Sequence, residues 1–178
     1  MKAVLLTGPG GPEMLRYGEA PDPIAALGEV VVDIHVASVN AADYKVRRGG
    51  GIYGNIQLPH ILGRDFSGVI SALGRDVTDL AVGDAVFGVT EQGVEGVYAE
   101  KIAIKSVLVA RKPDRLGHAE AAAMALTSLT ALWAIEDTAG AGGVAGFGIQ
   151  LTKYLAPRSS PQRALAIIPM CAVSVPIG

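Results

Sequence analysis

Hydrophobic and polar residues alternate over short stretches in the first two thirds of the chain. The clearest stretch is 29–39, EVVVDIHVASV, whose alternate positions carry Val30, Val32, Ile34 and Val36. This period of two is typical of a half-buried strand, with the residues between them on the other face. The pattern therefore predicts a strand with one apolar face.

Similar short runs follow between turn-forming sequences such as GPGGP and VGDAV. They predict further strands at Lys2–Leu6, Phe66–Leu73, Ala85–Val89, Val97–Ile104 and Ser106–Ala110. Short strands separated by turn signals indicate a compact, barrel-like antiparallel core. Asn40 is expected to cap a short helix over Ala41–Arg48, which the glycines at 49–51 end. Gly63, Gly68, Gly83 and Gly88 are expected to serve backbone geometry.

The pattern changes after Lys112. His118–Asp137 is rich in alanine and leucine without internal glycine or proline, so a helix is expected. A second helix is expected from Val144 to about Leu155, and the tail 157–178 fits neither a helix nor a strand. The most apolar run, at 121–135, is shorter than a membrane span and contains hydroxyl residues, so no membrane partner is expected.

Composition narrows the class of protein. The 178 residues include 15 basic and 17 acidic side chains, without a basic block that would favour nucleic acid. Cys171 is the only cysteine, which excludes an internal disulfide and a zinc site built from cysteines. The start, MKAVLLTGPGG, breaks into glycine and proline too early for a signal peptide. These features predict a cytoplasmic protein in a reducing compartment.

A glycine-rich segment, GAGGVAGFGIQLTK at 140–153, carries the candidate chemistry. Gly140, Gly142 and Ala145 form a G-x-G-x-x-A pattern, with Gly143 and Val144 between them. Such a turn lets a diphosphate approach backbone N–H groups at a helix N-terminus. By itself the pattern is weak, because glycine-rich turns often precede helices. The motif also needs a buried strand before it, whereas the residues at 131–139 read as the end of a helix.

Taken together, several ordered motifs resemble the medium-chain dehydrogenase/reductase superfamily, in its zinc-free quinone oxidoreductase (zeta-crystallin-like) branch. The motifs are MKAVLLTGPGGPE, VVVDIHVASVNAADYKVRRG, LPHILGRDFSGVI, VGDAVFG, YAE, LTSLTAL and GAGGVAGFGIQLTK, and they cover residues 1 to about 155. The resemblance implies a mixed α/β fold: a GroES-like β-barrel-type domain at 1–117, followed by an incomplete Rossmann-type dinucleotide-binding segment at 118–156.

The resemblance also implies chemistry without zinc. Zinc-dependent relatives place a cysteine at the position of Asn40 and a histidine at that of Arg64, and neither amide nor guanidinium replaces those ligands. His35, His60 and His118 show no ligand spacing and are expected to be surface or structural residues. The implied reaction is direct hydride transfer from NADPH, or from NADH, to a quinone or α,β-unsaturated carbonyl compound.

The same resemblance assigns roles to individual residues. Asn40 would donate a hydrogen bond near the substrate carbonyl or nicotinamide, or else only cap its helix. Lys45 would bind ribose or pass a proton, or else be a solvated lysine, and Tyr44 is as suited to packing as to chemistry. Thr130 would contact the nicotinamide end, or else bond back to its own helix. Gly140, Gly142, Gly143, Val144 and Ala145 would bind the cofactor.

Two departures from the relatives concern the cofactor segment. About a dozen residues, including the first Rossmann strand, are missing before Gly140. Beyond Ala156 the chain reads PRSSPQRALAIIP, but restoring one G in a back-translation yields GATVVATASARNHPYVRSLGADR, which resembles the relatives. We therefore expect residues 157–178 to be an out-of-frame, poorly structured tail. Exposed apolar faces would then favour self-association, or the chain would form a homodimer.

Two functions follow from the sequence. The first is an NADPH-dependent quinone or enone reductase acting without metal. The alternative is a non-catalytic, truncated remnant that retains a folded GroES-like domain, since a fold does not by itself confer an activity.

Overall fold

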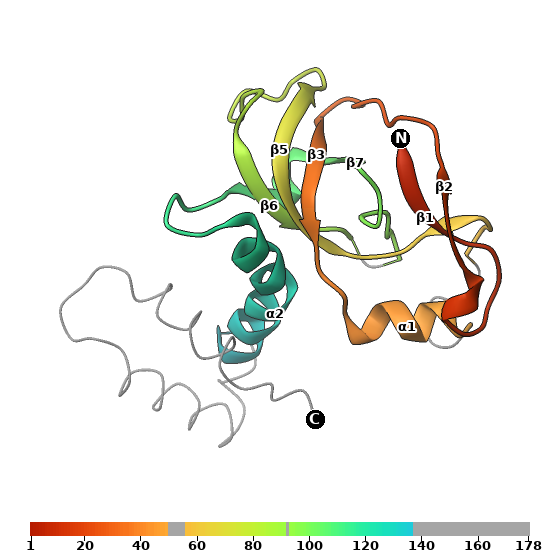
Figure 1. The fold of residues 1–178 in the computed structure, drawn as a ribbon. Coiled ribbons are helices and arrows are strands. Elements are labelled where there is room, and N and C mark those ends of the chain that lie inside the picture. Colours follow the sequence, from red (N-terminus) through yellow and green to blue (C-terminus); the bar gives the residue numbers. More distant parts are fainter. Residues whose placement is uncertain (50–55, 92, 137–178) are drawn as a thin grey trace. The chain divides into compact units, whose positions relative to one another are not determined.

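The computed structural model describes residues 1–49, 56–91 and 93–136, which form mainly antiparallel strands (Figure 1). The elements in chain order are β1 (Lys2–Leu6), the 3₁₀ helix η1 (Pro12–Met14), β2 (Leu15–Glu19), β3 (Glu29–Ala37), α1 (Ala41–Arg47), β4 (His60–Ile61), β5 (Asp65–Leu73), β6 (Ala85–Val89), β7 (Lys101–Lys105), the 3₁₀ helix η2 (Ser106–Leu108), β8 (Val109–Arg111) and α2 (His118–Glu136). Contacts divide the chain into two units, Met1–Ala123 and Met124–Gly178.

The strands of the first unit form two antiparallel sheets. The smaller sheet has the order β2-β1-β4, and the larger one β7-β3-β5-β6-β8. Figure 1 shows β3, β5 and β6 running side by side, with α1 following the end of β3. An isolated bridge between Ala3 and Ala99 connects β1 to the segment before β7. The mixed α/β class and the antiparallel core predicted from the sequence are confirmed.

The apolar alternation of β3 builds the main core. Val30 and Val32 are fully buried with Phe66, Ile70 and Val86 of the neighbouring strands. Burying such side chains stabilises the fold by about 1.5–3 kcal/mol each. A second cluster contains Leu6, Val46 and Leu62, so that α1 is anchored through its Val46 side chain.

The structure corrects several boundaries. β3 ends at Ala37 rather than at 39, and Val31, on the face opposite Val30 and Val32, is also buried, at 4% exposed. The register of β3 against β5 also shifts between Ile34 and Val36, so His35 bulges from the ladder and the strict alternation ends there.

Two predicted strands differ more. The stretch 97–100 does not belong to β7, which begins at Lys101; instead, the Val4 N–H donates to the Tyr98 carbonyl at 2.8 Å and the Glu100 N–H donates to the Lys2 carbonyl at 3.0 Å. Residues 106–110 contain the 3₁₀ helix η2 before β8 begins. Strands β2 and β4 were not predicted, because β2 is polar and β4 has only two residues.

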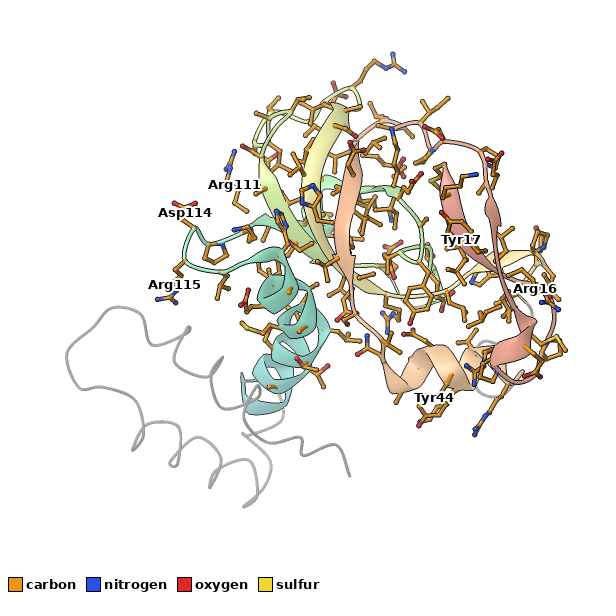
Figure 2. The ribbon with its side chains drawn as sticks, viewed as in Figure 1. Arg16, Tyr17, Tyr44, Arg111, Asp114 and Arg115 are labelled. Carbon is orange, nitrogen blue, oxygen red and sulfur yellow. The ribbon has the colours of Figure 1, made fainter. Side chains whose placement is uncertain are left out.

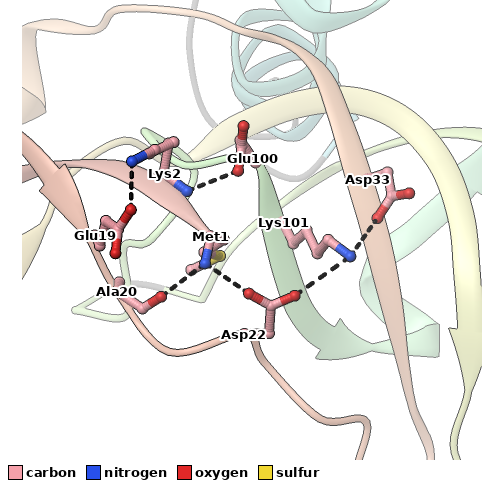
Figure 3. A network of polar contacts seen from close by, with 8 residues as sticks. All are labelled: Met1, Lys2, Glu19, Ala20, Asp22, Asp33, Glu100 and Lys101. Carbon is pink, nitrogen blue, oxygen red and sulfur yellow. Dashed lines mark hydrogen bonds and ion pairs between the residues drawn. The ribbon is translucent and has the colours of Figure 1, made fainter.

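A polar network holds the edges of the two sheets together (Figure 3). The Met1 ammonium donates to the Ala20 carbonyl at 2.8 Å and to Asp22 at 2.6 Å. Lys101 of β7 lies 3.5 Å from the same aspartate and 3.8 Å from Asp33 of β3. Such surface ion pairs contribute little to stability, but they link the β1–β2 hairpin to β7.

In the part of the chain that the structure describes, no helix is both long and apolar enough to cross a bilayer. A cytoplasmic location remains an expectation. The glycine-rich segment at 140–145, the second helix and the tail lie outside the described residues, and the domain limits inferred from the resemblance remain predictions.

Candidate active site

The N-terminus of α1 carries a polar cluster built around Asn40. Asn40 is the N-cap and forms a capping box with Asp43, whose carboxylate accepts the Asn40 backbone N–H at 2.7 Å. A capping box satisfies backbone N–H groups that have no partner within the helix. The expectation that Asn40 caps this helix is confirmed.

The Asn40 side chain is held by Asp65 and Ser38. Its amide nitrogen donates to Asp65 Oδ1 at 2.6 Å and to Ser38 Oγ at 3.3 Å, while the Ser38 hydroxyl donates to the same Asp65 oxygen at 2.5 Å. Asp65 is fully buried at the start of β5. Because both amide protons are used, a ligand oxygen at Asn40 would have to replace one of these bonds, and the 3.3 Å bond to Ser38 is the weaker.

Tyr98 joins this cluster from the segment before β7. Its hydroxyl donates to Asp43 Oδ2 at 2.8 Å, whereas Asp43 Oδ1 is buried without a hydrogen-bond partner among the described residues. Burial raises the pKa of Asp43, and the nearby carboxylates of Asp65 and Glu95 raise it further, although its hydrogen bonds oppose the shift. Burial, the hydrogen bond to Asp43 and its negative charge also raise the pKa of Tyr98.

The position of Tyr98 depends on Gly63. Gly63 has a φ of +91°, and a Cβ there would lie 2.5 Å from the Tyr98 ring. A glycine provides this left-handed turn and the space for the ring without strain. The expectation of a geometric role for Gly63 is confirmed.

Arg64 directly precedes β5 and Thr90 directly follows β6, and the two residues contact each other. Arg64 Nη2 donates to the Thr90 carbonyl at 3.0 Å, and the Thr90 N–H donates to the Arg64 carbonyl at 2.8 Å. Arg64 Nε and Thr90 Oγ1 are buried without a hydrogen-bond partner among the described residues. Buried polar atoms of this kind require a partner such as water or a ligand.

The other two residues proposed on α1 do not join the Asn40 cluster. Tyr44 is 42% exposed, and the Arg48 guanidinium lies 5.6 Å from the centre of its ring. Lys45 is exposed and makes no hydrogen bond or ion pair with any residue that the structure describes. Their catalytic roles remain predictions, and they face solvent in this part of the chain (Figure 2 labels Tyr44).

Thr130 lies on α2 in the second unit, where its exposed hydroxyl donates to the Leu126 carbonyl at 2.9 Å. This is the helix-bonded alternative that the sequence left open; the oxygen can still accept a hydrogen bond, so contact with nicotinamide remains a prediction. Gly140, Gly142, Gly143, Val144 and Ala145 lie outside the described residues.

Asn40 and Arg64 do not supply zinc ligands in the described structure. The Asn40 amide nitrogen and the Arg64 guanidinium are both hydrogen-bond donors engaged with oxygen atoms. Zinc requires thiolate, imidazole or carboxylate ligands. In the described ranges no three histidine, cysteine or acidic side chains converge on a common point.

The three histidines have structural surroundings. His60 Nε2 lies 2.9 Å from Glu95 Oε2, and His118 Nδ1 lies 2.8 Å from Ser67 Oγ. The exposed His35 ring contacts the His118 ring with centroids 4.4 Å apart. The expectation of surface or structural histidines is confirmed.

Sequence reasoning missed Asp43, Asp65, Ser38 and Tyr98. Asp43 could have been found, because an acidic residue three positions after an N-cap is the spacing of a capping box. The partners of Asp65 lie 25 and 27 positions away in the sequence, and Tyr98 is 55 positions from Asp43. Local patterns cannot reveal contacts over such separations.

A pocket of about 300 Å³ lies between the hairpin β1–β2 and β3, lined by residues that include Val4, Tyr17, Ile34, His35, Tyr98 and Glu100. Its volume is at the lower end of the range for small-molecule sites. Tyr98 thus both lines this pocket and contacts the α1 cluster through its hydroxyl.

Comparison with known proteins identifies the family. Residues 26–114 match the alcohol dehydrogenase GroES-like domain. The chain is 34% identical to the mitochondrial NAD(P)H oxidoreductase RTN4IP1 of Dictyostelium discoideum over 76% of its own length and 40% of the relative's. It is 33% identical to the 2-methylene-furan-3-one reductase of Solanum lycopersicum, covering 87% of this chain and 45% of that protein.

Solved structures agree with these relatives. The quinone oxidoreductase from Coxiella burnetii superposes with a TM-score of 0.74 at 33% identity, covering 86% of this chain and 53% of the other. The chain therefore spans about half the length of the proteins that it matches. On these grounds the chain belongs to the medium-chain dehydrogenase/reductase superfamily, in its quinone oxidoreductase branch, and contains the alcohol dehydrogenase GroES-like domain.

Proposed function

We propose that this chain takes part in the NADPH-dependent reduction of a quinone or an α,β-unsaturated carbonyl compound, without a metal ion. The observation that carries the proposal is the Asn40 cluster, in which Asp65 holds a neutral amide. The resemblance places a zinc ligand of the zinc-dependent relatives at this position. Family membership supports the class of reaction, since the relatives include a protein named as an NAD(P)H oxidoreductase and one named as a quinone oxidoreductase.

The residues of the chain would orient the substrate. When bound, NADPH supplies the hydride. Asn40 would exchange its 3.3 Å bond to Ser38 for a bond to the substrate carbonyl, while its shorter bond to Asp65 keeps the amide in position. A donor already held in place stabilises developing negative charge on the oxygen without reorganising.

Other residues would hold the cofactor and the proton. Gly140, Gly142, Gly143, Val144 and Ala145 would take the diphosphate, and Thr130 the nicotinamide end. Lys45, exposed on α1, would bind ribose or deliver a proton to the reduced product. NADH in place of NADPH remains compatible with these groups.

The test is NADPH oxidation by the purified chain, followed at 340 nm with 1,4-naphthoquinone. Replacing Asn40 by Ala is expected to lower kcat/KM about a hundredfold, the usual effect of losing one oxyanion donor. Val107→Ala, which alters an exposed residue on η2, serves as the control and should leave the rate unchanged. Absence of oxidation, together with no rise in Tm on adding NADPH, would overturn the proposal.

One observation favours a second candidate, a non-catalytic GroES-like module. Both sheets lie within Met1–Ala123. The two clusters of buried side chains described above lie within the same unit. A unit with its own core can persist without a working cofactor segment. In that case neither NADPH nor a quinone would change the stability of the chain.

A further inference from the structure

Arg64 and Thr90 face each other at the end of the β5–β6 ladder. The register pairs Asp65 with Val89, and the Thr90 N–H, which donates to the Arg64 carbonyl at 2.8 Å, continues that pairing by one step. The Arg64 side chain adds a bond from Nη2 to the Thr90 carbonyl at 3.0 Å. Residues directly opposite in an antiparallel ladder point to the same side. The two side chains therefore lie together.

Each of these residues keeps one donor that the described protein does not use. Arg64 Nε and Thr90 Oγ1 are both buried without a partner, and Thr90 is only 4% exposed. Arginine remains protonated in proteins, so its Nε–H cannot avoid the need for an acceptor by losing the proton. Two unused donors on adjacent side chains match one oxygen atom, which can accept two hydrogen bonds.

We propose that Arg64 and Thr90 form a subsite for a carbonyl oxygen of the substrate other than the one that Asn40 would hold, such as the second oxygen of a quinone. The inference rests on the proposed reductase function and adds a binding group to it. Arg64 directly precedes Asp65, the residue that holds Asn40, so the subsite is one residue along the chain from the Asn40 cluster. Gly63, immediately before Arg64, has a φ of +91°, and a Cβ there would lie 2.5 Å from the Tyr98 ring, so this turn requires glycine.

The charges nearby favour a neutral oxygen over an anion. Asp43, Asp65 and Glu95 are all buried, and the effect of the last two on the pKa of the first shows that they lie within electrostatic reach. A phosphate or carboxylate would add a further negative charge to this group of acids. A ketone or quinone oxygen accepts the same two bonds without a net charge.

The experiment observes the Arg64 Nε–H directly by ¹H–¹⁵N NMR, with 1-tetralone as the probe. This ketone has an acceptor oxygen but no reactive alkene, and tetralin, which lacks the oxygen, is its matched control. The Arg64 signal is assigned by its loss in Arg64→Lys. We expect 1-tetralone, but not tetralin, to shift it.

Variants of Arg64 and Thr90 then measure how much each donor contributes to the binding of 1-tetralone. Thr90→Val is expected to weaken binding of 1-tetralone about tenfold or less, and Arg64→Lys at least about tenfold, whereas Thr90→Ser retains binding. If Arg64→Lys fails to fold, the binding of 1-tetralone to Thr90→Val still tests the subsite. If 1-tetralone does not shift the Arg64 Nε–H signal, and this signal receives magnetisation only from water, then water is the acceptor. That result would overturn the proposal.

These outcomes separate the subsite from the proposed function. If Arg64→Lys and Thr90→Val reduce 1,4-naphthoquinone at the wild-type rate, the subsite is wrong and the reductase function stands. If 1-tetralone shifts the Arg64 signal but NADPH is never oxidised, the ketone subsite stands and the reductase function fails.

Discussion

Asp43 holds its carboxylate in surroundings that disfavour a charge. The residue is 3% exposed, and one of its oxygens accepts two hydrogen bonds while the other has no partner among the described residues. Burial and the neighbouring acids raise its pKa above the ordinary 3.8. The folded state therefore binds a proton more tightly than the unfolded state, and this residue lowers stability as the pH rises above 3.8.

Asp43→Asn is accordingly expected to raise Tm at pH 7.5, because the amide oxygen can still accept from Asn40 and Tyr98 and no charge is buried. The gain should shrink as the pH falls toward 4 and Asp43 becomes protonated in the wild type. Thermal unfolding of both proteins between pH 4 and 8 checks this. A gain that persists unchanged at acid pH would show that charge burial is not the cause.

Two glycines allow the cost of a left-handed backbone to be measured separately from the cost of a steric clash. Gly63 and Gly83 have similar φ values of +91° and +94°, but a Cβ at Gly63 would lie 2.5 Å from the Tyr98 ring, and one at Gly83 meets nothing within 4 Å. We expect Gly83→Ala to cost about 1–2 kcal/mol, for the backbone alone. Gly63→Ala should cost about 1–3 kcal/mol more, because the packed ring must move.

Urea unfolding of both glycine variants measures the difference. Equal losses of stability would mean that Tyr98 moves aside freely. In that case the ring would not hold the turn before Arg64.

Among the elements, the start of α2 is joined to β5 by a histidine. Ser67 is buried and donates its proton to the Val86 carbonyl at 2.8 Å, so its oxygen must accept from His118 Nδ1–H. Burial is the main cause that lowers the pKa of His118, and the charges of His35 and Lys112 lower it further. His35, on the bulge of β3, is the ring that contacts it.

The sign of the pH effect follows from that pKa. Because the folded state binds the proton of His118 less tightly than the unfolded state, stability should fall as the pH drops below 6.5. His118→Gln is expected to reduce the loss of stability between pH 7.5 and 5.5, measured by urea unfolding. His60→Gln, which removes a histidine elsewhere, is the control, and an equal reduction there would contradict the assignment.

For the whole molecule, the two units predict how the chain responds to protease. Because both sheets and both clusters lie within Met1–Ala123, we expect chymotrypsin to leave a resistant fragment that retains at least those residues. If the proposed function holds, NADPH should extend the protection through Leu155. Mass spectrometry of the digest gives the end points, and cleavage within β3 or β5 would contradict an independent first unit.

The nucleotide sequence of the gene tests the prediction that the tail at 157–178 is out of frame. If one base has been lost there, a compatible second reading frame must exist at Ala156. Sequencing across codons 135–180 would reveal it, and a sequence without that frame would remove the hypothesis.

The alternation of apolar residues at 29–36 and the short runs around it were sufficient to predict an antiparallel core. The Asn40 cap and the helix from His118 were predicted as well, because strand faces, caps and breakers depend on residues a few positions apart. Zinc was argued against from Asn40 and Arg64 by residue type alone.

Only the tertiary structure decided what these residues contact. It placed Asp65 and Ser38 on the Asn40 amide, Tyr98 on Asp43, and Thr90 opposite Arg64. It left Tyr44 and Lys45 exposed on the same helix. The physical reason is that burial and hydrogen-bond partners arise from strands far apart in the sequence, whose register is set by packing of the whole core.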